Sequence, residues 1–162
     1  MLASEADWAN AYDLHADDVY RVARVILRSP EDAGEVVQST FEAAFRHRDR
    51  YDTSRSLRAW LLGIASHEAL HLARRERIRS WLPLAPSRAA EEPPDPAPVW
   101  QAVNALPPGH RACVALFYLH GFSMEEIAVM LRIPRGTVAS RLHTARRRLR
   151  ELLSDARAEV TT

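Results

Sequence analysis

The 162-residue sequence contains no lysine, one cysteine and five glycines. Its single cysteine, Cys113, has no partner for an internal disulfide and cannot by itself form a cysteine-based zinc site. Five glycines leave little scope for a glycine-rich loop that holds phosphates. No apolar run approaches the roughly 20 residues that cross a bilayer, and the N-terminus lacks the basic and apolar segments of a signal peptide. We therefore expect a protein of the reducing cytoplasm that does not insert into membranes.

Every one of the 22 basic residues is arginine, and basic and acidic side chains alternate in blocks along the chain. Residues 1–45 contain three arginines and nine acidic residues, whereas residues 46–80 contain nine and four. Residues 111–150 are basic again, with eight arginines against two acidic residues. Arginine is a permanent cation whose planar fork suits phosphates and base edges. The alternation predicts two surfaces for a polyanion and an acidic face for another partner, with solvated helix faces as the alternative.

A proline-rich stretch divides the sequence, although its length alone predicts about one domain. Six prolines lie between residues 83 and 98, and proline both fixes φ and removes a backbone donor. This stretch is therefore expected to be a semi-rigid, extended linker that holds two modules apart. We predict a first domain at 1–80, the linker at 81–98, a second domain at 99–155 and a short tail at 156–162.

The rest of the sequence predicts an all-α fold, because apolar residues recur at spacings of three and four without β-type alternation. Local signals mark several helix ends: Ser29-Pro30 starts a helix, Gly121 ends one, and Ser123 with Glu126 forms a capping box. The first domain is expected to contain three helices, at about 7–28, 30–46 and 57–79. The second is expected to contain four, at about 99–106, 108–120, 124–131 and from 135 onward.

Two apolar stripes define which faces of these helices should be buried. In the second helix the expected buried residues are Val36, Val37, Phe41, Ala44 and Phe45. In the last helix the stripe consists of Val138, Leu142, Ala145, Leu149 and Leu152, and arginines occupy much of the remaining surface. A short helix, a break at Ile133-Pro134 and a basic second helix are typical of helix-turn-helix DNA binding.

The two domains together resemble one protein family. The second resembles region 4 of the bacterial sigma-70 family, in its extracytoplasmic-function (ECF) group, over GFSMEEIAVMLRIPRGTVASRLHTARRRLRELL. The first resembles region 2 of the same group, through VVQSTF in one helix and WLLGIA in the next, which ends in an arginine cluster. The resemblance runs from about Trp8 to Leu153 in the family's order. It implies a dissociable promoter-specificity subunit of RNA polymerase that is not an enzyme and needs no cofactor or metal.

The resemblance also implies partners and the residues that contact them. The partners are core RNA polymerase, through its largest-subunit clamp helices and its flap, promoter DNA and an anti-sigma factor. Cytoplasmic location follows, with nucleoid association in the holoenzyme. Contacts to the core are assigned to Glu35, Val36, Gln38, Ser39 and Glu42. Contacts to the minus-ten element are assigned to Asp52, Thr53, Ser54, Arg55, Ser56, His67, Arg74 and Arg75. Contacts to the minus-thirty-five element are assigned to Arg135, Thr137, Ala139, Ser140, Arg141, His143, Thr144, Arg146 and Arg147.

Four positions depart from the family's pattern. Ala139 and Thr144 stand where long basic residues are common, so the usual minus-thirty-five preference does not transfer directly. Gly34 and Ser39 replace acids that are frequent in the core-binding helix, and glycine also costs about 1 kcal/mol of helix propensity relative to alanine.

Two other functions remain open from the residues alone. A stand-alone helix-turn-helix regulator would use the same recognition helix, but it would leave the VVQSTF helix without a role. A small zinc peptidase would use His67-Glu68-x-x-His71, which matches the metalloprotease signature of two ligands and a general base on one helix. A catalytic zinc needs a third protein ligand and a cleft, and the sequence offers no convincing third ligand.

Overall fold

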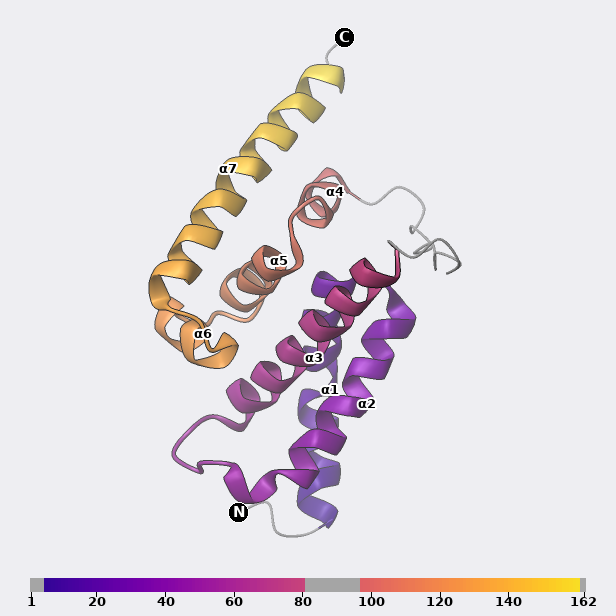
Figure 1. Cartoon of the computed structure of the whole chain (residues 1–162), viewed down its shortest axis with the longest axis vertical. Coiled ribbons are helices and arrows are strands. Elements are labelled where there is room, and N and C mark those ends of the chain that lie inside the picture. Colours follow the sequence, from indigo (N-terminus) through magenta and orange to yellow (C-terminus); the bar gives the residue numbers. More distant parts are fainter. Residues whose placement is uncertain (1–4, 81–96, 161–162) are drawn as a thin grey trace.

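The computed structural model describes residues 5–80 and 97–160, and these residues form seven α-helices without a strand (Figure 1). The predicted all-α class is therefore confirmed. Most of the predicted proline linker lies outside the described residues. Helices α1 to α3 form one group and helices α4 to α7 form a second, which lies against one side of the first (Figure 1).

The first group is a three-helix unit of α1 (Glu5–Leu27), α2 (Pro30–Arg46) and α3 (Leu57–Arg79). Helix α2 starts where predicted, because the Ser29 hydroxyl accepts a hydrogen bond from the Asp32 backbone N–H at 3.2 Å. The Ser56 hydroxyl caps α3 in the same way, accepting from the Ala59 N–H at 3.3 Å. A single 3₁₀ turn, Arg48–Arg50, begins the connection between α2 and α3.

The second group contains α4 (Pro98–Asn104), α5 (Pro108–Val114), α6 (Met124–Leu131) and α7 (Arg135–Val160). The predicted capping box of α6 is present, since Ser123 and Glu126 exchange backbone-to-side-chain hydrogen bonds of 3.1 and 2.7 Å. Two residues with positive φ turn the chain, Gly121 at 75° before α6 and Arg132 at 53° after it.

Two local expectations are wrong in this group. The predicted helix at 108–120 ends as an α-helix at Val114 and continues as one π-type turn over Ala115–Leu119. Apolar spacing predicts a helix here but does not distinguish a π-type turn from an α-helical turn, because one turn contains too few residues to reveal a change of period. Helix α7 continues to Val160, so the predicted tail from residue 156 does not begin at a helix end.

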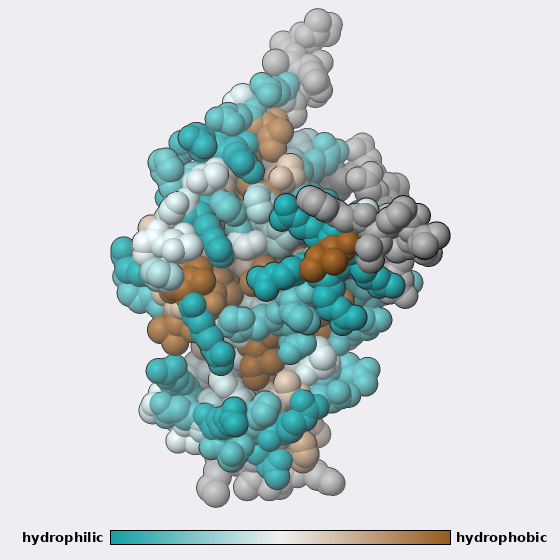
Figure 2. Space-filling model, in the orientation of Figure 1, coloured by the Kyte–Doolittle hydropathy of each residue, from teal (hydrophilic) through white to brown (hydrophobic). Residues whose placement is uncertain are grey.

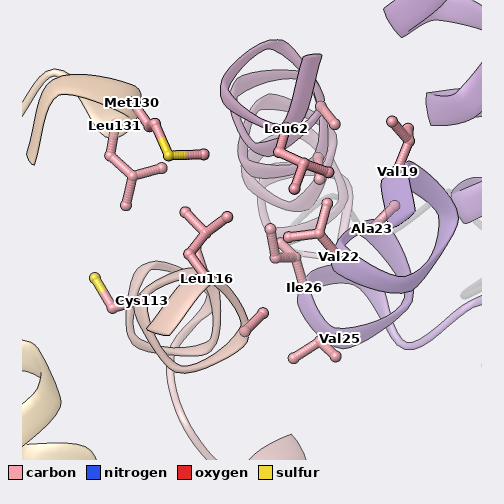
Figure 3. Close-up of a cluster of buried hydrophobic side chains, with 14 of the residues drawn as sticks. Val19, Val22, Ala23, Val25, Ile26, Leu62, Cys113, Leu116, Met130 and Leu131 are labelled. Carbon is pink, nitrogen blue, oxygen red and sulfur yellow. The ribbon is translucent and has the colours of Figure 1, made fainter. Parts of the chain in front are cut away.

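One apolar core extends through both groups of helices. Figure 3 shows Val22 and Ile26 of α1 and Leu62 of α3 facing Leu116 and Met130 of the second group. The predicted separation of the two modules by the linker is therefore wrong for this conformation, because apolar faces on both modules bury each other.

Eleven large apolar side chains are exposed in the described part of the chain, and the face in Figure 2 is mainly hydrophilic with separate apolar patches. Phe45 was assigned to the buried stripe of α2 by its spacing, but it is 47% exposed. It lies beside Ala44 at the end of the helix and packs edge-on against Trp8, with ring centroids 5.5 Å apart. Leu152 of α7 is likewise exposed. None of the described helices is long and apolar enough to span a membrane.

Candidate nucleic-acid interface

Helix α7 has the position of a recognition helix, following the short helix α6 after a tight turn. Its first turn is fixed by backbone hydrogen bonds from Thr137 and Val138 to the Pro134 carbonyl, at 2.9 and 3.3 Å. An ion pair of 2.5 Å between Arg135 and Glu125 links its start to the start of α6. These contacts set the direction in which α7 leaves the turn.

The two sides of α7 differ in chemistry. Val138, Leu142 and Ala145 are buried against the rest of the second group. Ser140 and His143, three residues apart, and Arg147, four residues further, are exposed on the other side. Thus two short side chains capable of base-edge hydrogen bonds and one cation share an open face, the arrangement that direct readout requires. Ala139 and Thr144 lie half-buried at its edges.

Two of the predicted minus-thirty-five residues, Arg141 and Arg146, are turned toward neighbouring segments of the second group. The Arg141 guanidinium lies close to Gly109 of α5, where a β-carbon would stand 2.9 Å from Nη1. It also lies beside the Cys113 thiol. Burial raises the pKa of this thiol, and the positive charge of Arg141 partly opposes the increase. Arg146 donates from Nε to the Tyr118 hydroxyl at 2.6 Å. Both are only half-exposed, so Arg147 and Arg148 are the more accessible cations.

The loop before α3 exposes every predicted minus-ten residue between 52 and 56. Asp52 folds this loop by accepting a hydrogen bond from the Ser54 N–H at 2.9 Å. Hydrogen bonding by the Ser54 side chain and, second, by the Ser54 backbone lowers the pKa of Asp52. The Tyr51 hydroxyl donates to the Arg55 carbonyl at 2.7 Å. Asp52 and Ser56 have structural roles and Arg55 pairs with Asp52 through Nε at 3.7 Å, while Thr53, Ser54 and Arg55 are all exposed to solvent.

The predicted minus-ten residues of α3 differ in accessibility. Arg74 and Arg75, in its C-terminal half, are exposed. His67 is half-buried, and its Nε2 lies 3.0 Å from the Met130 carbonyl of α6. Helix α6 of the second group therefore covers His67 but leaves Arg74 and Arg75 accessible.

The predicted core-binding face of α2 is exposed, with one exception. Glu35, Gln38 and Glu42 are open to solvent, and Gln38 donates to Glu42 at 2.9 Å. Val36 is 2% exposed, because it lies on the side of α2 that packs into the core. The apolar stripe predicts this burial, which leaves Val36 little surface for a contact with the core enzyme in this conformation. Ser39 is half-buried and donates to the backbone carbonyl of Val36.

A groove between α1 and α2 borders this face, with a volume of about 710 Å³. Its walls include three exposed aromatic side chains that sequence reasoning missed: Tyr12, Tyr20 and Phe45. Tyr12 and Tyr20 are spaced eight residues apart, which places them on one side of α1. The eight-residue spacing of Tyr12 and Tyr20 is the sequence signal that indicates an aromatic face on this helix.

The contact between the two groups of helices contains a polar cluster that no local sequence pattern indicates. Arg58 of α3 pairs with Asp18 of α1 through Nε at 2.7 Å. The same guanidinium reaches the second group at His120, with Nη1 3.2 Å from the carbonyl and Nη2 3.0 Å from Nδ1. Burial lowers the pKa of His120; Asp18 opposes this shift, and Arg58 adds to it.

A second arginine crosses the same contact. Arg111 of α5 is 5% exposed and donates to the Ile26 carbonyl at the end of α1, with Nε at 3.0 Å. Its Nη1 donates to the Leu106 carbonyl. The negative end of the α1 dipole lies at the Ile26 carbonyl, which favours a cation there. Burial and, second, the charge of Arg28 lower the pKa of Arg111 to about 10.

The zinc-peptidase motif has a different environment. His67 contacts the Met130 carbonyl, whereas His71 is exposed on the next turn. Over residues 5–80 and 97–160, no three histidine, cysteine or acidic side chains are grouped so that they could hold a metal ion.

Two helical modules, the second a helix-turn-helix with an exposed polar recognition face, define a DNA-binding protein. Comparison with known families matches sigma-70 region 2 to residues 11–79 and sigma-70 region 4 to residues 97–149. The chain belongs to the sigma-70 family, in its ECF group. The resemblance seen in the sequence is thus confirmed.

Individual relatives agree with this assignment. The ECF sigma factor SigL of Mycobacterium tuberculosis is 34% identical over 94% of this chain and 93% of its own length. SigE of Mycolicibacterium smegmatis is 34% identical over 98% of this chain, which spans 66% of SigE. The sigma factor CarQ of Myxococcus xanthus is 30% identical over 90% of this chain and 88% of its own.

Solved structures are similar across both modules. The sigma factor RpoE of Bartonella quintana, in complex with the anti-sigma factor NepR, has a TM-score of 0.74 and 26% identity. That match covers 91% of this chain and 97% of RpoE. CnrH, in complex with the cytosolic domain of CnrY, has a TM-score of 0.70 and 25% identity, with coverage of 94% and 91%.

Proposed function

We propose that this protein is a promoter-specificity subunit of bacterial RNA polymerase, with the first module binding the core enzyme and the minus-ten element and the second reading the minus-thirty-five element. The observation that carries the proposal is that region 2 and region 4 occur in order in one chain, each with an exposed polar face. The chain itself would supply binding and positioning, and the polymerase would supply catalysis.

The chemistry of each face supports this division. On α2, Glu35, Gln38 and Glu42 offer an acidic, hydrogen-bonding surface next to the aromatic groove, which suits a basic helical partner such as the clamp helices. On α3 and its preceding loop, Arg55, Arg74 and Arg75 provide the cationic track that single-stranded DNA binding requires.

Promoter binding would require the two modules to separate. His67 contacts the Met130 carbonyl while the modules are packed together, so a DNA strand can reach its Nε2 only when α6 moves away. Core polymerase would drive this change by binding the separated form more tightly than the packed form, which shifts the population toward separation.

An anti-sigma factor is a further proposed partner. RpoE and CnrH, which this fold matches over both modules, are each in complex with an anti-sigma protein. A protein that binds the packed arrangement would keep His67 covered and oppose polymerase binding. The proposed location is the cytoplasm, with nucleoid association in the holoenzyme.

The decisive experiment is equilibrium binding of the purified chain to bacterial core RNA polymerase. The test variant is Glu35→Arg with Gln38→Ala, and Glu151→Arg on α7 is a charge-matched control, since Glu151 is exposed in the other module. We expect the double variant to weaken binding at least tenfold and the control to bind within twofold of wild type.

Absence of binding by folded wild type would reject the sigma function. In that case, sequence-specific binding of duplex DNA by the chain alone would identify a stand-alone regulator instead. Zinc content measured on the same preparation tests the peptidase alternative, which requires about one metal ion per chain.

A further inference from the structure

A recess of about 580 Å³ between the two modules is lined by five arginine side chains. The first module contributes Arg28 after α1 and Arg74 and Arg77 on α3. The second contributes Arg111 on α5 and Arg141 on α7. The recess therefore exists as a single site only while the modules are packed together.

Carboxylates do not balance these five cations. Within residues 5–80 and 97–160, the lining contains two acidic residues, Asp32 and Glu76. Glu76 also pairs with Arg79, which is not part of the lining, at 3.4 Å. Arg111 directs its hydrogen bonds to the backbone carbonyls of Ile26 and Leu106. Five permanent charges thus face two carboxylates, and the recess has a positive field that attracts anions.

Packing of the modules brings arginines of opposite modules close together. Burial and, second, the charge of Arg28 lower the pKa of Arg111. The charged Arg111 guanidinium is therefore held at an electrostatic cost. An anion between the modules would offset that cost. The anion would gain more electrostatic binding energy in the recess than at an exposed arginine, because water and salt screen charges less in a partly enclosed site.

The remaining walls define the class of anion. They are aliphatic at Ile26, Leu27 and Leu70, and among the described residues of the lining none is aromatic, so these walls offer a nucleobase no ring on which to stack. Guanidinium forks bind phosphate oxygens in pairs. The volume lies within the usual range of small-ligand sites, roughly 300–1,000 Å³.

We propose that this recess binds a compact oligophosphate, either inorganic or the phosphate chain of a nucleotide, and that it does so only when the two modules are packed together. Because both modules supply the arginines, the ligand stabilises the packed form relative to the separated form. Oligophosphate and any partner that requires separation would then weaken each other's binding by the same factor.

The first test is calorimetric titration of the full chain with sodium tripolyphosphate at constant ionic strength. We expect saturable binding of one ligand per chain, weakened at least tenfold by Arg77→Ala and by Arg141→Ala, one variant from each module. Arg50→Ala and Arg150→Ala are matched controls on exposed arginines outside the recess, and each should change affinity less than twofold.

Two results of this titration would overturn the proposal. Wild type that shows no saturable binding would remove the site. Equal weakening by all four variants would mean diffuse attraction to a basic protein. Circular dichroism of each variant verifies that it is folded. Titration with GTP distinguishes the two sources of phosphate: affinity within threefold of tripolyphosphate supports recognition of the phosphate chain, and affinity more than tenfold higher contradicts it.

A second pair of variants tests the requirement for packing without changing any arginine. A β-carbon at Gly63 of α3 would lie 3.5 Å from the Met130 carbonyl, an ordinary contact distance. Gly63→Ala should therefore retain tripolyphosphate affinity, whereas Gly63→Leu should force α6 away and weaken binding at least tenfold. Undiminished binding by folded Gly63→Leu would overturn the link between the ligand and packing.

Discussion

The Arg58 guanidinium of the first module lies 3.0 Å from Nδ1 of His120 in the second, through Nη2. Arginine only donates, so the His120 Nδ1 must accept and the imidazole must carry its single proton on Nε2. His120 is 8% exposed, and its Nε2 has no hydrogen-bond partner in the described part of the chain. This contact between modules therefore requires a neutral histidine.

Mild acid should weaken the packed fold through His120. Its pKa is lowered by burial, so the unfolded chain binds this proton more readily than the folded chain. The resulting stability is fully present above the ordinary pKa of 6.5 and is lost as the pH falls from 6.5 toward the folded value. The urea midpoint should therefore decrease between pH 7.5 and pH 5.5.

The matched variant for this prediction is His120→Gln, whose side-chain oxygen can still accept from Arg58. His15 and His110 also have pKa values lowered by burial and remain in the variant, so the informative quantity is the difference between the two pH profiles. The variant should show a smaller decrease than wild type. Identical profiles would contradict a role for His120.

Replacing Arg111 should be the most destabilising change of a single arginine. Arg111→Ala leaves the buried Ile26 and Leu106 carbonyls without their donors. Each unpaired buried group costs about 1–3 kcal/mol, so for the two carbonyls we expect a loss of about 2–6 kcal/mol in the free energy of unfolding. Chemical denaturation measures it, with Arg150→Ala as the exposed control, expected within about 0.5 kcal/mol of wild type.

The size of residue 63 should control the separation of the modules. Alanine fits against the Met130 backbone, whereas the larger leucine side chain overlaps it. Small-angle X-ray scattering should give an unchanged radius of gyration for Gly63→Ala and a larger one for Gly63→Leu. If folded Gly63→Leu is as compact as wild type, the close approach of α3 and α6 does not limit the packing.

Substitutions on the exposed face of α7 should separate base recognition from phosphate binding. Ser140→Ala and His143→Ala are expected to change the ranking of minus-thirty-five sequences in transcription with core polymerase. Arg147→Ala should weaken all sequences by a similar factor and reduce the slope of log affinity against log salt by about 1. A uniform loss for all three variants would mean that Ser140 and His143 do not read bases.

Local chemistry was sufficient to predict most of the secondary structure. The ends of α2 and α6 follow from Ser29, Ser123 and Glu126, whose side chains hydrogen-bond within one turn of the helix. The helix-turn-helix follows from the buried spacing of Val138, Leu142 and Ala145. Such features depend on neighbouring residues only, so the sequence contains all the information needed to identify them.

The contact between modules could not be predicted in the same way. Arg58 and His120 are 62 residues apart, and Arg111 and Ile26 are 85 apart. Nothing near Arg58 distinguishes an arginine that will bridge two modules from one that will face DNA. The assignment of Val36 to the core contact follows the family motif alone, whereas the apolar stripe of the same helix already predicts that its side chain is buried.

The shared apolar core holds the two modules together, and their covalent linkage adds to its effect. Because the two modules belong to one chain, they meet at a raised effective concentration, which in linked proteins generally reaches the order of millimolar. An interface that would hold separate modules only at millimolar strength then suffices to keep about half of the chains packed. A partner that binds one form more tightly than the other can therefore shift most of the population to that form.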